Sequence, residues 1–250
     1  HDIFSFLTEK AEKYECASFI NDDPIKLLHQ FTNKKDIEII GFLVATIAWG
    51  NRKSIIKSGK NIIKLLDYSP FDFILNHSLK DLKGLIKFKH RTFNGQDLTY
   101  FIKRLKTIYL NEKNLENFIY MPKKNICEMQ SRFHENFFMY PHKKRTEKHV
   151  ANPSKGSAAK RINMFFRWMV RSNKNGVDFG IWNKIKPNQL SCPLDIHSGN
   201  VARKLGILKR KQNDHKAVIE LDRVLKLIIP NDPVKLDFAL FGLGIHENFK

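Results

Sequence analysis

Two short segments of the sequence place ionisable side chains where they could do chemistry. In residues 156–166 (GSAAKRINMFF), a turn of small residues leads into an apolar helix with Lys160 in its first turn. The start of a helix offers unpaired N–H groups and a positive dipole end, which suit a phosphate. If Lys160 is shielded from water its pKa falls, and its amine becomes a usable nucleophile near neutral pH. The alternative is a solvated lysine on a basic helix.

The second segment, residues 193–206 (PLDIHSGNVARKLG), opens another helix at Asp195. One reading makes Asp195 only the N-cap of the turn that reaches Ser198. The other gives its carboxylate a chemical task, since a carboxylate aimed at a cleft can take the proton of a neighbouring amine or stabilise positive charge on a sugar. The two roles are compatible, because a carboxylate has two oxygens. His197 reads as a packed residue that supports the site.

A third segment, residues 44–52 (VATIAWGNR), ends an apolar helix with Trp49, Gly50, Asn51 and Arg52. A small turn followed by an amide and a cation suits a loop that touches bases or fills a gap in a base stack. A helix end followed by a polar loop is also a common structural feature. Each segment by itself is therefore weak evidence.

The charge of the chain favours nucleic acid as the partner. The 250 residues carry a net charge of +19, and nucleic acid is the commonest partner of such a field. A general bias towards lysine could produce the same total. The uneven distribution argues against bias alone, because residues 141–175 hold ten basic side chains and one acidic, and residues 201–216 hold six and one. Both clusters lie beside the chemical motifs.

Other classes of protein and site receive no support. The three cysteines are far apart with no CxxC pair, so we expect reduced thiols and neither a disulfide framework nor a zinc or iron–sulfur site. No carboxylates or histidines stand at metal-ligand spacing, so we expect no metal and no cofactor. No run of eighteen apolar residues occurs and the first residues lack a signal-peptide pattern, so we expect a cytoplasmic protein, associated with the nucleoid, without a membrane partner.

The elements that must position these residues are helices. Apolar spacing of three and four predicts an all-α fold. Asp or Ser followed by Pro marks three further helix starts, at Pro24, Pro70 and Pro233, and the last of these helices should end at Gly244. Trp168 and Trp182 could stack on a base, but on apolar segments they are more often core. The predicted helices span residues 36–49, 54–66, 98–109, 158–171 and 216–229.

Taken in order, the three segments resemble the helix-hairpin-helix (HhH-GPD) DNA glycosylase superfamily. Residues 44–52 resemble its base-contacting loop, residues 156–163 resemble its hairpin and the helix bearing the catalytic lysine, and Leu194-Asp195-Ile196-His197 matches its catalytic aspartate segment. More narrowly, residues 156–244 are similar to a bacterial branch of the superfamily. The 35 positions between Lys160 and Asp195 are similar to the longer spacing in archaeal 8-oxoguanine DNA glycosylases.

The resemblance implies a two-lobed helical protein with a central cleft. A six-helix lobe would span residues 36–155, and residues 156–250 would form the second lobe, completed by residues 1–35. It further implies a DNA repair glycosylase with lyase activity that excises a damaged base, an oxidised purine among the options, with Lys160 and Asp195 catalytic. The partner would be damaged double-stranded DNA, bound by a monomer. The expected DNA contacts are Asn51, Arg52, Lys155, Gly156, Ser157, Arg161, Arg203 and Lys204.

The sequence also departs from the superfamily pattern. Ala158 stands where the hairpin usually has its second glycine, and the cluster-binding cysteines are missing, which excludes the iron–sulfur subclass. A non-catalytic module that binds nucleic acid on the same fold is therefore the alternative function. That alternative predicts salt-sensitive, lesion-independent binding and no covalent adduct.

Overall fold

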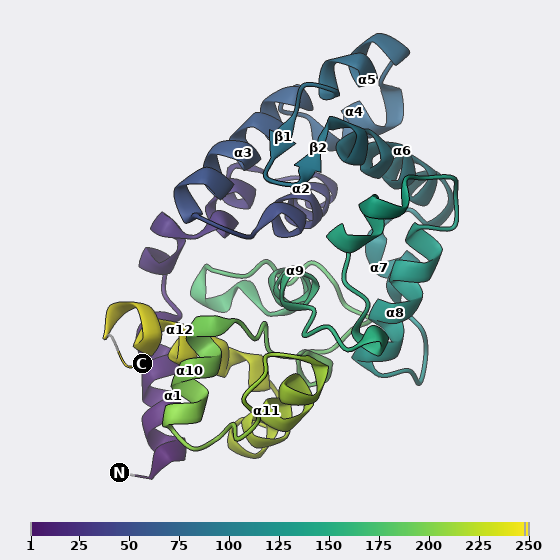
Figure 1. Ribbon diagram of the computed structural model, residues 1–250. Helices are drawn as coiled ribbons and strands as arrows, with labels where there is room; N and C mark the ends of the chain where they lie inside the picture. The colour runs from purple at the N-terminus through teal and green to yellow at the C-terminus, as the bar shows by residue number, and fades with distance from the viewer. Residues whose placement is uncertain (1, 248, 250) are drawn as a thin grey trace.

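The computed structural model describes residues 2–247 and 249, and its regular structure is almost entirely helical (Figure 1). The predicted all-α class is therefore confirmed. Among the described residues, strand is limited to an antiparallel hairpin of β1 (Lys89–His90) and β2 (Phe93–Asn94), which the sequence did not predict. No helix of the described chain is long and apolar enough to cross a membrane.

The helices follow the apolar periodicity of the sequence, and each of the five predicted ranges agrees with an observed helix to within one turn. The first half contains α1 (Ile3–Tyr14), η1 (Ala17–Asp22), η2 (Pro24–Gln30), α2 (Lys34–Ile47), α3 (Arg52–Leu65), α4 (Pro70–Asn76), α5 (Leu79–Leu85) and α6 (Gly95–Glu112), where η marks a 3-10 helix. Next come α7 (Leu115–Ile119), α8 (Ile126–Phe137), η3 (Lys144–His149), η4 (Pro153–Lys155) and α9 (Lys160–Val170). The remainder contains η5 (Asn173–Asn175), η6 (Pro187–Gln189), α10 (Ile196–Lys204), α11 (His215–Ile228), η7 (Pro233–Lys235) and α12 (Leu236–His246).

Three helix boundaries differ from the sequence prediction, one of them at Asp232-Pro233, which begins the 3-10 helix η7 while α12 starts at Leu236. The Asp23-Pro24 pair begins the 3-10 helix η2 instead of an α-helix, and the last helix continues past Gly244 to His246. Gly244 keeps helical dihedrals there, and the Cβ of an added side chain would lie 3.2 Å from Val201. The glycine is therefore a site of close helix packing between α12 and α10, and the helix does not end at it.

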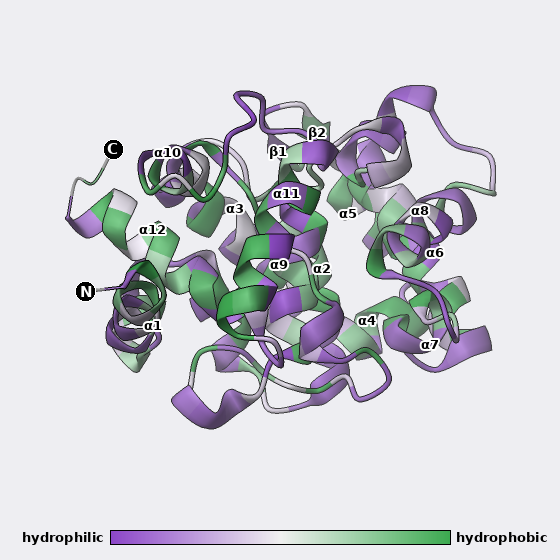
Figure 2. Ribbon diagram, turned by 90° about the horizontal axis from the view of Figure 1, so that it is seen from below, coloured by the Kyte–Doolittle hydropathy of each residue, from purple (hydrophilic) through white to green (hydrophobic). Residues whose placement is uncertain are grey.

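Helix α2 is the centre of a first apolar core. Every residue from Ile37 to Ile47 is buried, as expected for a helix that is apolar all round. It packs against α3, α4, η2 and α9, and Figures 1 and 2 both place α9 beside it in the middle of the molecule. Trp168 and Trp182 are buried in this core, which confirms the expectation that they are core residues.

A second apolar core joins the two ends of the chain. Helix α1 lies along α12, and α12 also packs against α10. The buried apolar residues of this cluster come from α1 and from residues 192–243. The first 35 residues are thus shared between the cores, because η2 packs on α2 and α3. The predicted division of the chain into lobes at residues 155 and 156 stays a prediction.

Candidate functional site

A cavity of about 990 Å³ lies where the two cores meet. Its wall combines parts of the chain that are distant in sequence, among them the start of η2, the loop between α2 and α3, the segment before α9, the start of α10 and one face of α12. It includes residues of all three segments that the sequence analysis singled out. The ionisable residues of the wall are Asp23, Arg52, His134, Glu147, Lys148, Lys155, Lys160, Arg161, Arg167, Asp195, His197 and Asp237.

A tight turn places Lys160 at the first position of α9. Gly156 has φ +91° and Ala159 has φ +51°, so both adopt the left-handed conformation. For alanine this conformation costs about 1–2 kcal/mol, and it persists only where the surroundings enforce it. The turn is anchored because the His215 N–H donates to the Gly156 carbonyl at 3.0 Å. The sequence lacks the usual second glycine, yet the chain still makes a left-handed turn before Lys160.

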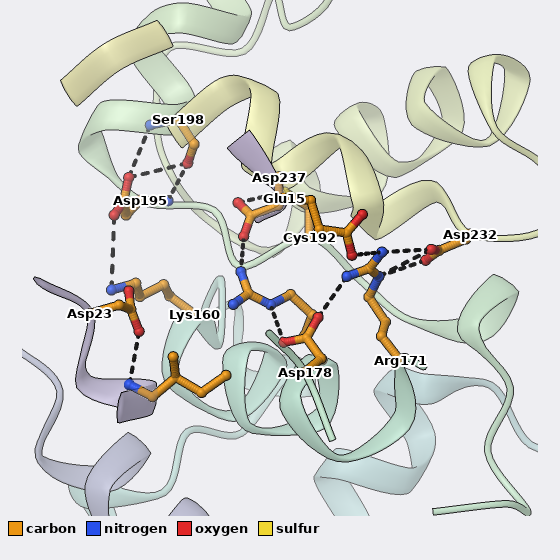
Figure 3. A network of polar contacts seen from close by, with 12 residues as sticks. Glu15, Asp23, Lys160, Arg171, Asp178, Cys192, Asp195, Ser198, Asp232 and Asp237 are labelled. Atoms are coloured by element: carbon orange, nitrogen blue, oxygen red, sulfur yellow. Dashed lines mark hydrogen bonds and ion pairs between the residues drawn. The ribbon is translucent and has the colours of Figure 1, made fainter. Parts of the chain in front are cut away.

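Asp195 has both of the roles that the sequence left open, and it uses a different oxygen for each. The Ser198 N–H donates to Oδ1 at 2.9 Å, which completes a capping box at the start of α10. Oδ2 lies 3.8 Å from the Lys160 Nζ, and the two side chains keep 34% and 25% of their surface exposed (Figure 3). The cap therefore holds the carboxylate in place while its second oxygen faces the amine. Two side chains 35 positions apart are brought together at the cavity wall.

Behind this pair lies a buried network of charges. Arg167 donates to Asp178 at 3.3 Å and to Asp237 at 2.8 Å, and Asp178 also accepts from Arg171 at 2.6 Å (Figure 3). Burial raises the pKa of Asp237 to about 6, although the nearby Arg167 opposes this shift. Asp237 and Arg167 also form part of the cavity wall. The charged side chains at this part of the cavity wall are thus held in ion pairs with each other.

Asp23 contributes a further carboxyl from the opposite part of the wall. It is the N-cap of η2, and its Oδ1 accepts from the Ile25 N–H at 2.9 Å. Burial raises the pKa of Asp23, while attraction to Arg167, Arg52 and Lys160 lowers it by a smaller amount. In Figure 3 Asp195 lies on one side of the Lys160 amine and Asp23 on the other.

Two cation–aromatic contacts frame the cavity. The Arg161 guanidinium lies 4.7 Å from the Trp49 ring centre and donates to the carbonyls of Thr46 and Lys148. Burial lowers the pKa of Arg161 to about 10. Arg52 lies 5.2 Å from the ring of Phe241 on α12, so it spans the cavity between the two cores. Such contacts are worth about 0.5–2 kcal/mol each.

The predicted DNA contacts fall into two groups. Arg52, Lys155, Gly156, Ser157 and Arg161 line the cavity, as does His197. The remaining three lie outside the wall and have other contacts: Asn51 caps α3 by accepting from Ser54, Arg203 donates to the Arg210 carbonyl and to Asn213, and Lys204 lies 4.8 Å from the Phe249 ring. Arg203 still bears on the site, because Asn213 donates to the Asp195 carbonyl at 2.9 Å.

A row of lysines lies along the exposed side of α3 and is not part of the cavity wall. Spacings of four, three and four residues place four lysines on one helix face, and α3 contains no acidic residue. Like charges at these spacings, and cations in the first turn of a helix, both destabilise an isolated helix. None of the four has an ion pair within residues 2–247 and 249. We call this row, Lys53, Lys57, Lys60 and Lys64, the α3 ridge.

Sequence reasoning missed several residues of the wall. Asp23 was assigned only a helix start, and Asp237, Phe241 and Arg167 were assigned only to apolar helices. A local signal for Asp237 and Arg167 did exist, since a charged residue inside an apolar helix face is expensive unless it is paired. Nothing local shows that they share a cavity. The lysines of the α3 ridge were detectable from their spacing alone.

No metal-binding cluster is present in the part of the chain that the structure describes: no three side chains of His, Cys, Asp or Glu gather as ligands of one ion would. The three cysteines are free thiols, as the sequence predicted. Burial raises the pKa of the Cys192 thiol well above its usual value, so this residue is protonated at neutral pH.

The fold and the site define a mostly helical protein with a Lys–Asp pair in a basic-rimmed cavity between two cores. The chain belongs to a family of proteins of unknown function, DUF2400, whose family model matches residues 23–246. This range includes every cavity residue named above, and α1 lies outside it. No curated protein matches the chain, and no solved structure matches it.

Proposed function

We propose that this protein is a DNA glycosylase with lyase activity that removes a damaged base through a covalent intermediate on Lys160. The observation that carries the proposal is the approach of the Lys160 Nζ to the Asp195 Oδ2, 3.8 Å apart at the wall of one cavity. A nucleophile beside a base that a third group orients is the arrangement covalent catalysis requires. Here the backbone and hydroxyl of Ser198 orient Asp195.

The steps follow from this geometry. The Asp195 Oδ2 takes a proton from the Lys160 ammonium, and the free amine attacks C1′ of the damaged nucleotide. The bond between C1′ and the base breaks, and its electron pair leaves with the base. Opening of the sugar then gives a Schiff base between Lys160 and C1′. Loss of a proton from C2′ eliminates the 3′ phosphate and nicks the strand.

The electrostatics support a nucleic-acid substrate. Lys148, Lys155 and Arg52 line the cavity, and the α3 ridge begins at Lys53, the residue after Arg52. Duplex DNA carries one negative charge per about 1.7 Å, and lysines that neutralise phosphates supply sequence-independent affinity. The cavity volume lies within the range of ligand sites, which suits a base flipped out of the stack. An oxidised purine is the first lesion to test, because the spacing from Lys160 to Asp195 is similar to that of the archaeal 8-oxoguanine enzymes.

The test is borohydride trapping during turnover on a panel of lesion-bearing and abasic duplexes. Borohydride reduces a Schiff base, so wild type should form a covalent protein–DNA adduct that Lys160→Ala does not form. Lys174→Ala is the matched control, because it removes an exposed lysine that is not part of the cavity wall and should still form the adduct. The proposal is wrong if wild type forms no adduct, or if Lys160→Ala forms as much. Salt-sensitive binding without any adduct would instead support the non-catalytic nucleic-acid-binding module.

A further inference from the structure

The carboxyl groups of the cavity differ in how many of their oxygens are already engaged. Four such groups line the wall. Both oxygens of Glu147 contact His142 or Lys144, and those of Asp237 contact Arg167 and Cys192. Those of Asp195 contact Ser198 and Lys160, as described above.

Asp23 is the exception. Its Oδ1 caps η2 through the Ile25 N–H, and its Oδ2 has no hydrogen-bond or ion-pair partner within residues 2–247 and 249. Asp23 is partly exposed and lines the cavity, so an oxygen of its carboxyl group that has no protein partner is available to a ligand. Among the four cavity carboxyls, Asp23 therefore has the one oxygen free to contact a bound nucleotide.

The surroundings of Asp23 suit an acid better than a base. Three cations act on it, Arg52 from α3 and Lys160 and Arg167 from α9, yet burial outweighs their attraction and raises its pKa. Asp195 already faces the Lys160 amine and serves as the proton acceptor. Two carboxyls whose environments differ in this way can divide acid and base roles within one site.

We propose that Asp23 is the general acid that protonates the departing base, an assignment that rests on the glycosylase function proposed above. As the bond between C1′ and the base breaks, its electron pair moves onto the base. The proton on the Asp23 Oδ2 passes to a ring nitrogen or carbonyl oxygen of that base, which leaves neutral. Asp23 is left as a carboxylate, stabilised by Arg52 and Arg167. A positioned acid of this kind typically accelerates a reaction by about 10²–10⁴-fold.

The experiment separates two reactions of the same site. Excision of a damaged base needs a protonated leaving group, whereas Schiff-base formation on a duplex that already lacks the base does not. Asp23→Asn keeps an oxygen for the Ile25 N–H and removes the acid. We expect the ratio of the excision rate to the abasic trapping rate to fall on the order of 10²-fold in this variant. The lesion duplex is the one that wild type excises fastest in the panel.

A pH profile and a matched variant complete the test. In wild type, single-turnover excision should slow as the pH rises and Asp23 loses its proton, and in Asp23→Asn this dependence should vanish. Asp81→Asn is the control, because Asp81 belongs to the capping box of α5 and is not part of the cavity wall. It should leave the ratio unchanged.

Three results would overturn the assignment. If Asp23→Asn excises as fast as wild type, the proton comes from elsewhere. If it loses excision and trapping in equal proportion, Asp23 has only a structural role. If wild type forms no adduct even with the abasic duplex, the glycosylase function fails and the assignment fails with it. The first two results leave the glycosylase function intact, so the two failures are distinguishable.

Discussion

The double role of Asp195 leads to a prediction in which stability and activity separate. Asp195→Asn retains an oxygen for the Ser198 N–H but loses the negative charge next to Lys160, whereas Asp195→Ala loses both. Asn caps helices as well as Asp does, and replacing either by Ala costs about 1 kcal/mol. For a chain of this length, that cost lowers the melting temperature by about 2–4 °C. We expect this decrease for Asp195→Ala and little change for Asp195→Asn.

The effect on activity should be far larger and should be shared by both variants. Loss of a general base typically slows a reaction by about 10²–10⁴-fold, which corresponds to roughly 3–5 kcal/mol in the barrier. That energy exceeds the loss of the cap several-fold, so slower trapping cannot be attributed to the cap. Thermal unfolding followed by circular dichroism gives the first quantity, and single-turnover borohydride trapping on an abasic duplex gives the second.

Ser198→Ala is the control for the cap. It removes the hydroxyl that accepts from the Asp195 N–H at 2.9 Å, and it leaves the contact with Lys160. This variant should lose about 1 kcal/mol of stability and keep most of the trapping activity. The reasoning is refuted if Asp195→Asn is as unstable as Asp195→Ala and still traps DNA at the wild-type rate. That outcome would make Asp195 a helix cap and nothing more.

Three further predictions concern the DNA surface, pH dependence and helix packing. Affinity for DNA falls as the salt concentration rises. Changing all four lysines of the α3 ridge to Gln should make the slope of log affinity against log salt shallower by up to about 3.6, measured by fluorescence anisotropy. Burial raises the pKa of Asp222 from 3.8 to about 6, so the folded state holds this proton more tightly and stability should fall as the pH rises through that interval. In Asp222→Asn, the fall in the free energy of unfolding over this pH interval, measured by urea unfolding, should be smaller by about 3 kcal/mol at most. Gly242→Ala should destabilise by about 1–3 kcal/mol, because the added Cβ would lie 2.1 Å from the Tyr14 ring, whereas Gly84→Ala has open space.

The first two of these predictions each have an outcome that would contradict them, and the first also has a control variant. A salt slope that stays at the wild-type value would show that the α3 ridge does not contact phosphates. The control is a variant with four lysines changed elsewhere on the protein, and an equally shallow salt slope in that variant would show only an effect of net charge. For Asp222, an unchanged pH dependence in the Asn variant would contradict the prediction. The control variant changes four lysines around α6 and α7, on the other side of the first core in Figures 1 and 2: Lys103, Lys106, Lys113 and Lys123.

Much of the local structure could be predicted from the sequence because its causes are local. Apolar spacing predicted α2, and its residues from Ile37 to Ile47 are all buried, since a helix that is apolar on nearly all sides has no face to present to water. Asp195 was recognised as an N-cap because the cap bonds to an N–H three residues away. The predicted boundary was wrong where the last turn depends on a neighbour, as at Gly244, where α12 continues because it packs against α10.

The arrangement of the site depended on contacts between elements, which no local pattern encodes. The sequence predicted Arg161 as a DNA contact but did not show that its side chain contacts the Thr46 carbonyl at the end of α2 and the Trp49 ring, which it does because α9 packs along α2. Asp23 and Asp237 are more than 200 positions apart and meet at one cavity only because η2 and α12 pack near the start of α9.

The sequence by itself determined the helical class, the apolar helix α2, the caps at Asp23 and Asp195, and the residue types available for chemistry. Each follows from interactions within a few residues, where periodicity and capping act. Only the tertiary structure decided that the Lys160 amine and the Asp195 carboxylate face each other, and that Asp23 keeps a free oxygen. Those facts depend on how α9, α10 and η2 pack, because the apolar surfaces buried between helices set the relative positions of their ends.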